Sequence, residues 1–411
     1  MSQLIAEAAL ANAANPTPAP WRIITKMTYF AGLIGTFGVG MLYLIVVRPV
    51  LHRPSVDPRH RDVLERRAGL LLALIGTWFL VALYFQIAGK ASRAEDSEIP
   101  YGEALVPSTI WEYVRAPANP GEWVAGGTLT LVQYLMWAVS AVVLILLWSP
   151  RVRSRTAEVV GAALVLAFVA HQVTLLPTNF GEATFHGVLD ISMNHLHVFA
   201  IATWVGGITG LVVLAAAGRR LGPAAGATWA QLWTRFSTLA LAAVGCVLIS
   251  GLFLTWMTVG SPADLFTTSF GRFLLVKVSL VAVMICIGGL NEFVMFPRIA
   301  KARAAGEEGS VFRLALRTVP ALVAVEVALA VCVLFVLTFL TGSAREEAGD
   351  PDPTLSGGII ALGALLVVML AVSFVTTAKL SERLSRSPLT GKEEGRPLPA
   401  HSPGDDRASQ R

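Results

Sequence analysis

The sequence predicts an all-α membrane protein, a polytopic bundle of about nine transmembrane helices. Hydrophobic residues make up 55% of the 411 residues and charged residues only 14%, whereas a soluble domain carries about a quarter charged residues. The apolar residues form long uninterrupted runs, and about 20 helical residues cross the hydrocarbon core of a bilayer. Because barrel strands alternate polar and apolar residues, these runs exclude a membrane barrel.

The apolar runs predict nine spans, at 27–47, 68–89, 124–148, 159–177, about 191–218, 236–260, 273–296, 318–342 and 357–378. They divide the chain into a tail at 1–26, a four-helix half at 27–178, a second four-helix half at 191–342, a ninth helix at 357–378 and a tail at 379–411. Residues 1–26 lack the basic start and apolar stretch of a secretory signal, so we expect the first span to remain as an anchor. The last tail is rich in Pro, Ser, Gly and charge, which predicts disorder.

The basic residues predict the orientation of the bundle. The segments 48–67, 149–158, 219–235, 297–317 and 379–411 hold 24 of the 32 Lys and Arg residues. Since cytoplasmic loops carry the excess of Lys and Arg, we expect the N-terminus outside and the C-terminus inside. The net charge of +5 then follows from the bilayer rule and calls for no nucleic-acid partner. On the outer side, Pro-rich segment 90–123 predicts short helical turns that lie on the surface.

The two halves are weakly similar to each other. The stretch YFAGLIGTFGVG at 29–40 resembles HVFAIATWVGGI at 197–208, and each is followed by a basic loop and an Arg that leads into the next helix. Both stretches belong to spans that run from outside to inside, so they predict a parallel repeat.

Polar side chains inside the predicted spans mark candidate functional positions, because burying them in lipid costs several kcal/mol unless they are paired or hydrated. They are His171 and Gln172 in span four, Met193, His195 and His197 in span five, Lys277, Asn291 and Glu292 in span seven, and Glu326 in span eight. At about 1.5 Å per residue, the three histidines share an outer layer on adjacent antiparallel helices.

Helical phase groups these outer residues further. Met193 and His197 are four residues apart and share a face, whereas His195 and His197 are about 200° apart. The prediction is therefore a cluster of His171, His197 and Met193, with His186 in the loop as an outer collector. His195 either faces elsewhere or joins these metal ligands if the helix starts later than residue 195. Imidazole and thioether ligands favour copper, as Cu(I) or Cu(II), over hard cations.

Two other interpretations of the histidines remain open. They can hydrogen-bond across helices as polar contacts without a ligand, or His171 and His197 can be the axial ligands of a haem. Deeper in the bundle, we expect Asn291 and Glu326 to meet in the inner half. Lys277 is expected either to extend toward the outer surface or to lie near the histidine layer, where its charge opposes metal binding.

Five pieces of the second half, in order and spacing, resemble the copper resistance protein D (CopD) family of bacterial membrane proteins. They are HVFAIATWVGGI, WTRFSTLA with ISG at 249–251, TTSFGRFLLVKVSL, GGLN ending in Asn291, and the Glu326 helix ending in LTFLTG. His171 occupies the place of a His that is common in the first half of longer members. The chain departs from the pattern at Phe270, where Tyr is common, and in its ninth span.

The resemblance implies copper handling at the bacterial plasma membrane, with a periplasmic copper-binding protein as a partner. It implies a permease rather than an enzyme. We expect copper to be captured by His197, His171 and Met193 and to pass Asn291 and Glu326. Because the sequence has no nucleotide-binding loop, we expect this transport to be passive or coupled to the membrane potential. The alternatives are a haem-binding redox or oxidase-assembly protein that uses the same histidines, and a scaffold subunit that packs through Gly206 and Gly207.

Overall fold

The computed structural model describes residues 18–94, 99–179, 185–259 and 263–340. These residues form helices and no strand, which confirms the all-α prediction for this part of the chain. They contain 8 helices long and apolar enough to cross a membrane, so the protein is a multi-pass membrane protein. These helices are Pro20–Leu51, Pro58–Ala91, Gly126–Trp148, Thr156–Leu175, Gly187–Leu221, Pro223–Thr258, Ser269–Ala304 and Glu308–Leu340. The predicted ninth span at 357–378, the tail at 379–411 and residues 1–17 of the predicted tail at 1–26 lie outside the described residues, whereas the first helix already begins at Pro20. The orientation stays a prediction.

Each span is built from one or more helical elements. The first half contains α2 (Pro20–Ile34), η1 (Gly35–Val39), η2 (Leu42–Val47), α3 (Arg48–Leu51), α4 (Pro58–Ala91), α7 (Gly126–Ile145), η3 (Leu146–Trp148), α8 (Pro150–Arg153), α9 (Thr156–Gln172) and η4 (Val173–Leu175). The second contains α10 (Phe185–Ile201), η6 (Ala202–Gly206), α11 (Gly207–Gly218), η7 (Arg219–Leu221), η8 (Pro223–Ala225), α12 (Gly226–Thr258), α13 (Asp264–Thr267), α14 (Ser269–Leu290), η9 (Asn291–Met295), α15 (Phe296–Ala304), α16 (Glu308–Arg313), η10 (Leu314–Thr318) and α17 (Val319–Leu340).

Several helices extend beyond the predicted apolar runs, since hydrophobicity marks only the part of a helix that crosses lipid. Helix α4 begins at Pro58 because Pro is tolerated in the first turn and the Asp57 side chain accepts a 2.8 Å hydrogen bond from the Arg59 backbone N–H. Similarly, the Thr268 hydroxyl caps α14 by accepting from the Gly271 N–H at 3.0 Å. Helix α10 begins at Phe185, so the outer histidines lie deeper in their helix than predicted.

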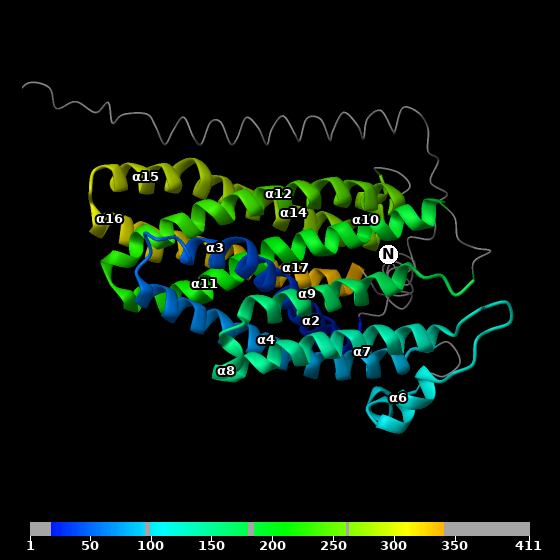
Figure 1. Cartoon of the computed structure of the whole chain (residues 1–411). Helices are drawn as coiled ribbons and strands as arrows, with labels where there is room; N and C mark the ends of the chain where they lie inside the picture. Colours follow the sequence, from blue (N-terminus) through cyan, green and yellow to red (C-terminus); the bar gives the residue numbers. More distant parts are fainter. Residues whose placement is uncertain (1–17, 95–98, 180–184, 260–262, 341–411) are drawn as a thin grey trace, which may run out of the picture.

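The long helices run side by side (Figure 1). Helix α4 packs on α2 and α7, and α7 packs on α9, whereas in the second half α10 packs on α12 and α14 on α17. The first and fifth spans meet at the centre of the bundle through η1 and η6. In segment 99–125, the short helices α5 (Tyr101–Ala104) and α6 (Pro107–Val114) confirm the predicted helical turns.

The central contact depends on two glycines. A Cβ added to Gly38 would lie 1.9 Å from the Ala202 carbonyl oxygen, and one added to Gly206 would lie 2.3 Å from the Ile34 carbonyl oxygen. Only residues without a Cβ allow the two backbones to approach this closely. Both glycines belong to the self-similar stretches of the sequence, and in both stretches the helix changes to the wider π form.

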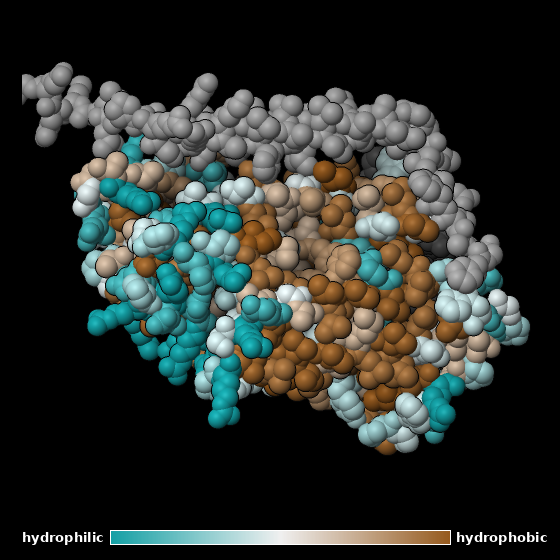
Figure 2. Space-filling model, in the orientation of Figure 1, coloured by the Kyte–Doolittle hydropathy of each residue, from teal (hydrophilic) through white to brown (hydrophobic). Residues whose placement is uncertain are grey.

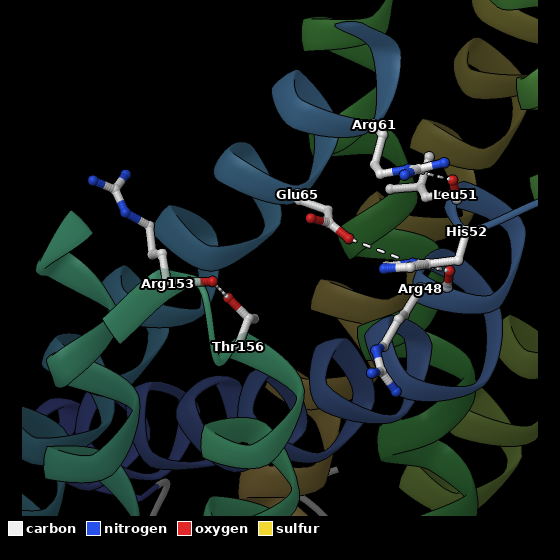
Figure 3. A network of polar contacts seen from close by, with 7 residues as sticks. All are labelled: Arg48, Leu51, His52, Arg61, Glu65, Arg153 and Thr156. Carbon is white, nitrogen blue, oxygen red and sulfur yellow. Dashed lines mark hydrogen bonds and ion pairs between the residues drawn. The ribbon is translucent and has the colours of Figure 1, made fainter. Parts of the chain in front are cut away.

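The surface shows the division expected of a membrane protein. Hydrophilic side chains gather at the end of the bundle that holds α3, α8 and α16, an apolar belt covers the middle of the visible face, and further hydrophilic residues lie at the opposite end, near α6 (Figure 2). We call the first of these the basic end. There, His52 and Glu65 form a 3.6 Å ion pair, and the Arg61 side chain donates a 2.9 Å hydrogen bond to the Leu51 carbonyl (Figure 3). These contacts tie α3 to α4 across the loop between the first two spans.

Candidate functional site

Two histidines from opposite halves of the protein are in direct contact. The end of α9 carries His171, and α10 carries His195; their ring centroids lie 4.2 Å apart. Both side chains are buried, with exposed fractions of 9% and 5%. Phe199, one turn after His195, packs edge-on against His171 at 5.1 Å, and Trp137 lies on its other side at 6.3 Å. The two imidazoles therefore lie in an aromatic surrounding between spans four and five.

Residues that directly follow His171 hold the ring of His195. The Thr174 hydroxyl donates to the His171 carbonyl at 2.9 Å, so it accepts the 2.8 Å hydrogen bond from Nε2 of His195. Nδ1 of His195 lies 3.2 Å from the side-chain amide of Gln172. Since the oxygen and nitrogen of an amide are assigned from the network, a neutral His195 requires the Gln172 amide nitrogen to donate to Nδ1.

His171 has no such support. Neither of its ring nitrogens has a hydrogen-bond partner among the described residues. A neutral imidazole offers one donor and one acceptor, and leaving buried polar atoms unpaired costs about 1–3 kcal/mol each. An unsatisfied buried group calls for an explanation, such as a bound ion or water. His171 is therefore the side chain that is best placed to accept a ligand.

His197 faces a different partner. Its Nδ1 lies 3.0 Å from the Ser250 hydroxyl on α12, and Ser250 donates to the Cys246 carbonyl at 2.5 Å. Ser250 must then accept from Nδ1, which leaves Nε2 of His197 with a lone pair. Lys277 on α14 is close enough to act on His197 electrostatically, and no ion pair joins Lys277 to a carboxylate within the described part of the chain.

The structure corrects the predicted grouping of these side chains. His195 contacts His171, whereas the sequence favoured His197 as that partner, and Nδ1 of His197 lies against Ser250. Helical phase separated His195 from His197 correctly, but it could not show which face of α10 meets span four. Met193 is half-buried, one turn before His197 on the same helix. His186 lies in the first turn of α10, and its side chain is outside the described residues.

A second polar group lies deeper in the bundle. The Asn291 side-chain nitrogen donates a 3.2 Å hydrogen bond to the Glu326 carboxylate, and both residues are buried, with exposed fractions of 5% and 3%. The Asn291 side-chain oxygen has no partner among the described residues. Next to it, Ser237 donates to Glu292. The predicted meeting of Asn291 and Glu326 is thus confirmed.

Sequence reasoning missed the side chains that support the histidines. Thr174 and Ser250 both look like ordinary hydroxyls near a helix end or in a helix, and they hold His195 and His197. The spacing of Thr174 three residues after His171 was an available signal for a local hydroxyl-to-carbonyl bond. Within the described residues, no group of three or more His, Cys, Asp or Glu side chains is arranged to hold a metal ion, so any ion at His171 and His195 has at most two such ligands there.

Comparison with known proteins shows similarity to a known family over part of the chain. Residues 230–340 match the family model of copper resistance protein D. The chain is also similar to the copper transport protein CutJ of Bacillus subtilis (strain 168), at 29% identity over 231 residues. That similarity covers 54% of this chain and 38% of the relative, so the chain spans well under half of the relative's length. No solved structure matches. The family match contains Ser250, Lys277, Asn291 and Glu326 and begins after the three histidines.

Proposed function

We propose that this protein transports copper across a bacterial plasma membrane and that His171 and His195 bind the ion on its way, because residues 230–340 match the family model of copper resistance protein D. One observation carries the choice of residues. The two buried imidazoles are in contact at 4.2 Å, and both nitrogens of one of them have no partner in the described part of the chain. Transport rather than catalysis agrees with the similarity to the copper transport protein CutJ.

The ligand chemistry supports copper over a hard cation. Imidazole nitrogens bind Cu(I) and Cu(II), whereas calcium and magnesium prefer carboxylate and carbonyl oxygens. His171 offers a ring nitrogen without breaking any hydrogen bond to a described residue, and His195 can exchange its contact with Gln172 or Thr174 for the ion. The Thr174 hydroxyl or the Gln172 amide, whichever stays bonded to His195, would then fix the orientation of its ring.

The opposite face of α10 is a weaker position for a cation. Met193 and His197 share that face and remain candidate ligands, with His186 as an outer collector. Yet Lys277 of α14 lies near His197, and an ammonium charge at that position would oppose a cation there. We therefore place the first binding step at His171 and His195.

The inner pair gives the proposed route toward the basic end. A buried carboxyl group with only a neutral amide beside it is stable when protonated, or when a cation replaces the proton. Glu326 is in this situation, since Asn291 is its hydrogen-bond partner. If the basic end faces the cytoplasm, an inside-negative potential draws copper inward, by about 2.3 kcal/mol per charge per 100 mV.

The test uses His171→Phe, which keeps a ring of similar shape and removes the ligand. Purified protein in detergent is titrated with Cu(I) against a competing chelator, and copper accumulation is measured in vesicles that contain the protein. We expect at least a tenfold loss of affinity and loss of accumulation. His60→Phe is the matched control, because His60 is also a buried histidine in a spanning helix. Unchanged copper affinity in His171→Phe would contradict the proposed site.

The geometry does not favour haem at the contacting pair. Ring centroids 4.2 Å apart leave no space for a haem plane between His171 and His195. A haem between His171 and His197 would need both imidazoles to face the same site. His171 instead contacts His195 on α10, and His197 faces Ser250 on α12. An absorption spectrum of the purified protein without a Soret band is the expected result.

A further inference from the structure

A hollow at the basic end of the bundle is unrelated to the histidine layer. It lies between α12 and α15, which pack side by side (Figure 1), and encloses about 710 Å³. Arg53, Arg235 and Arg303 contribute their side chains to its wall, with Gln231, Thr234 and Thr238 as further polar residues. No Asp or Glu is among the lining residues. The hollow thus carries positive charge that its own wall does not neutralise.

The arginines use few of their donors on the protein. Arg53 donates to the Gln231 side chain at 2.8 Å, and Arg235 donates through Nε to the Ile45 carbonyl at 2.6 Å. Arg303 makes no side-chain hydrogen bond and no ion pair to the rest of the described chain. Each guanidinium has five N–H donors in a fork that matches the oxygens of a phosphate. Most donors of the three arginines are therefore available to a ligand in the hollow.

The remaining wall of the hollow is apolar. Phe296, Ile299, Ala300 and Ala304 of α15 and Ala230 of α12 line it beside the arginines. Both helices belong to membrane-crossing spans, so this wall adjoins the level at which lipid chains begin. A free phosphate ion would gain nothing from these side chains, whereas a phospholipid has a charged head and an apolar body.

We propose that this hollow binds the phosphate headgroup of an anionic phospholipid, with the arginines on the headgroup and the α15 wall against the start of an acyl chain. Basic pockets between transmembrane helices on the cytoplasmic side hold anionic lipids in this way, by charge attraction of about 1 kcal/mol per Lys or Arg near the surface. The site is independent of copper transport, and its loss leaves the copper affinity of His171 and His195 unchanged.

The test compares two arginines of the same helix. Arg303 lines the hollow, whereas Arg298, also exposed on α15, does not. The full chain in detergent is titrated with phosphatidylglycerol, with phosphatidylcholine and with inorganic phosphate, and bound lipid is counted by native mass spectrometry. We expect wild type to bind phosphatidylglycerol more tightly than phosphatidylcholine or inorganic phosphate. The affinity for phosphatidylglycerol should fall about fivefold in Arg303→Gln and stay at the wild-type value in Arg298→Gln.

Each other outcome overturns the proposal. Equal losses in the two variants would show a general effect of surface charge, and equal binding of the two lipids would show that no headgroup is recognised. Inorganic phosphate that displaces phosphatidylglycerol at equal concentration would assign the hollow to a free anion. Unchanged lipid binding in Arg303→Gln would remove the site. Thermal melting of both variants checks that they are folded; Arg303 is exposed, so its substitution leaves the packing intact.

Discussion

Replacing His171 by Phe should make the copper-free protein more stable, although it removes a polar residue from the proposed site. The two ring nitrogens of His171 are buried without partners in the described chain, at a cost of about 1–3 kcal/mol each. Phe removes both costs and keeps the contacts with Trp137 and Phe199. Its larger ring costs about 1–3 kcal/mol in a packed site, so the mid-range values leave a net gain of about 2 kcal/mol.

The contrasting variant is His195→Phe. It leaves Thr174 and Gln172 without their imidazole partner, which costs about 1–3 kcal/mol for each group. Two rings in contact with each other should therefore respond with opposite signs. Thermal melting in detergent without copper measures both, and a destabilised His171→Phe would refute the reasoning, because it would mean that the nitrogens of His171 are satisfied.

Copper gives the same experiment a second measurement. A ligand at 100 times its dissociation constant stabilises the protein that binds it by about 2.7 kcal/mol. Because His171→Phe is expected to bind copper at least tenfold more weakly, it gains less of this stabilisation than wild type, by about 1.3 kcal/mol or more, so added copper should narrow or reverse the difference between their melting temperatures. A parallel rise in both proteins would show that copper binds elsewhere.

Three further predictions concern other parts of the molecule. Ser250→Ala removes the acceptor of His197 and should destabilise the protein by about 1–3 kcal/mol without changing its copper affinity. Thermal melting and chelator competition measure these two quantities, and a weaker copper affinity would mean that His197 binds the ion. Gly38→Ala should destabilise the protein by about 1–3 kcal/mol or more because the new Cβ meets the Ala202 carbonyl oxygen. The control is Gly288→Ala, whose new Cβ has no atom within 4 Å and which should melt at or above the wild-type temperature. Equal melting temperatures of the two variants would contradict the close crossing. Glu326→Gln keeps an acceptor for Asn291 and should leave melting and copper binding intact but slow copper entry into vesicles about tenfold; transport at the wild-type rate would exclude Glu326 from the route.

Much of the fold could be predicted because lipid restricts it strongly. Every backbone group inside a bilayer needs an internal partner, so a long apolar run can only be a helix. The first eight of the nine predicted spans each correspond to a candidate membrane helix. The helix starts were predicted less well, as at Pro58 and Phe185, because turns outside the lipid are held by caps and packing that hydrophobicity does not report.

The site could be predicted only in part, and the reason is geometric. Sequence shows which residues share a face of one helix, as it did for Met193 and His197. It does not show how far that helix is rotated toward its neighbours, since the rotation results from packing of all helices together. His195 faces span four because the crossing of the first and fifth spans at Gly38 and Gly206 fixes the rotation of α10 and η6.

The self-similar stretches show why the two halves differ in chemistry. Aligned residue by residue, they place Tyr29 opposite His197. Tyr29 lies among aromatic rings, 6.1 Å from Phe79 and 5.5 Å from Trp137, whereas His197 lies with Ser250 and near Lys277. One type of helix crossing thus supports an apolar cluster in the first half and a polar cluster in the second.

The contact of His171 with His195 differs from both clusters, because each half supplies one ring. A movement of one half against the other would change the separation of these two imidazoles directly, while the contacts of His197 with Ser250, within the second half, would stay intact. Ion affinity at a site that joins two bodies depends on their relative position, and a transporter must weaken its hold on the ion to release it. On this argument, the histidine pair between the halves is better suited to bind and release copper than the cluster around His197.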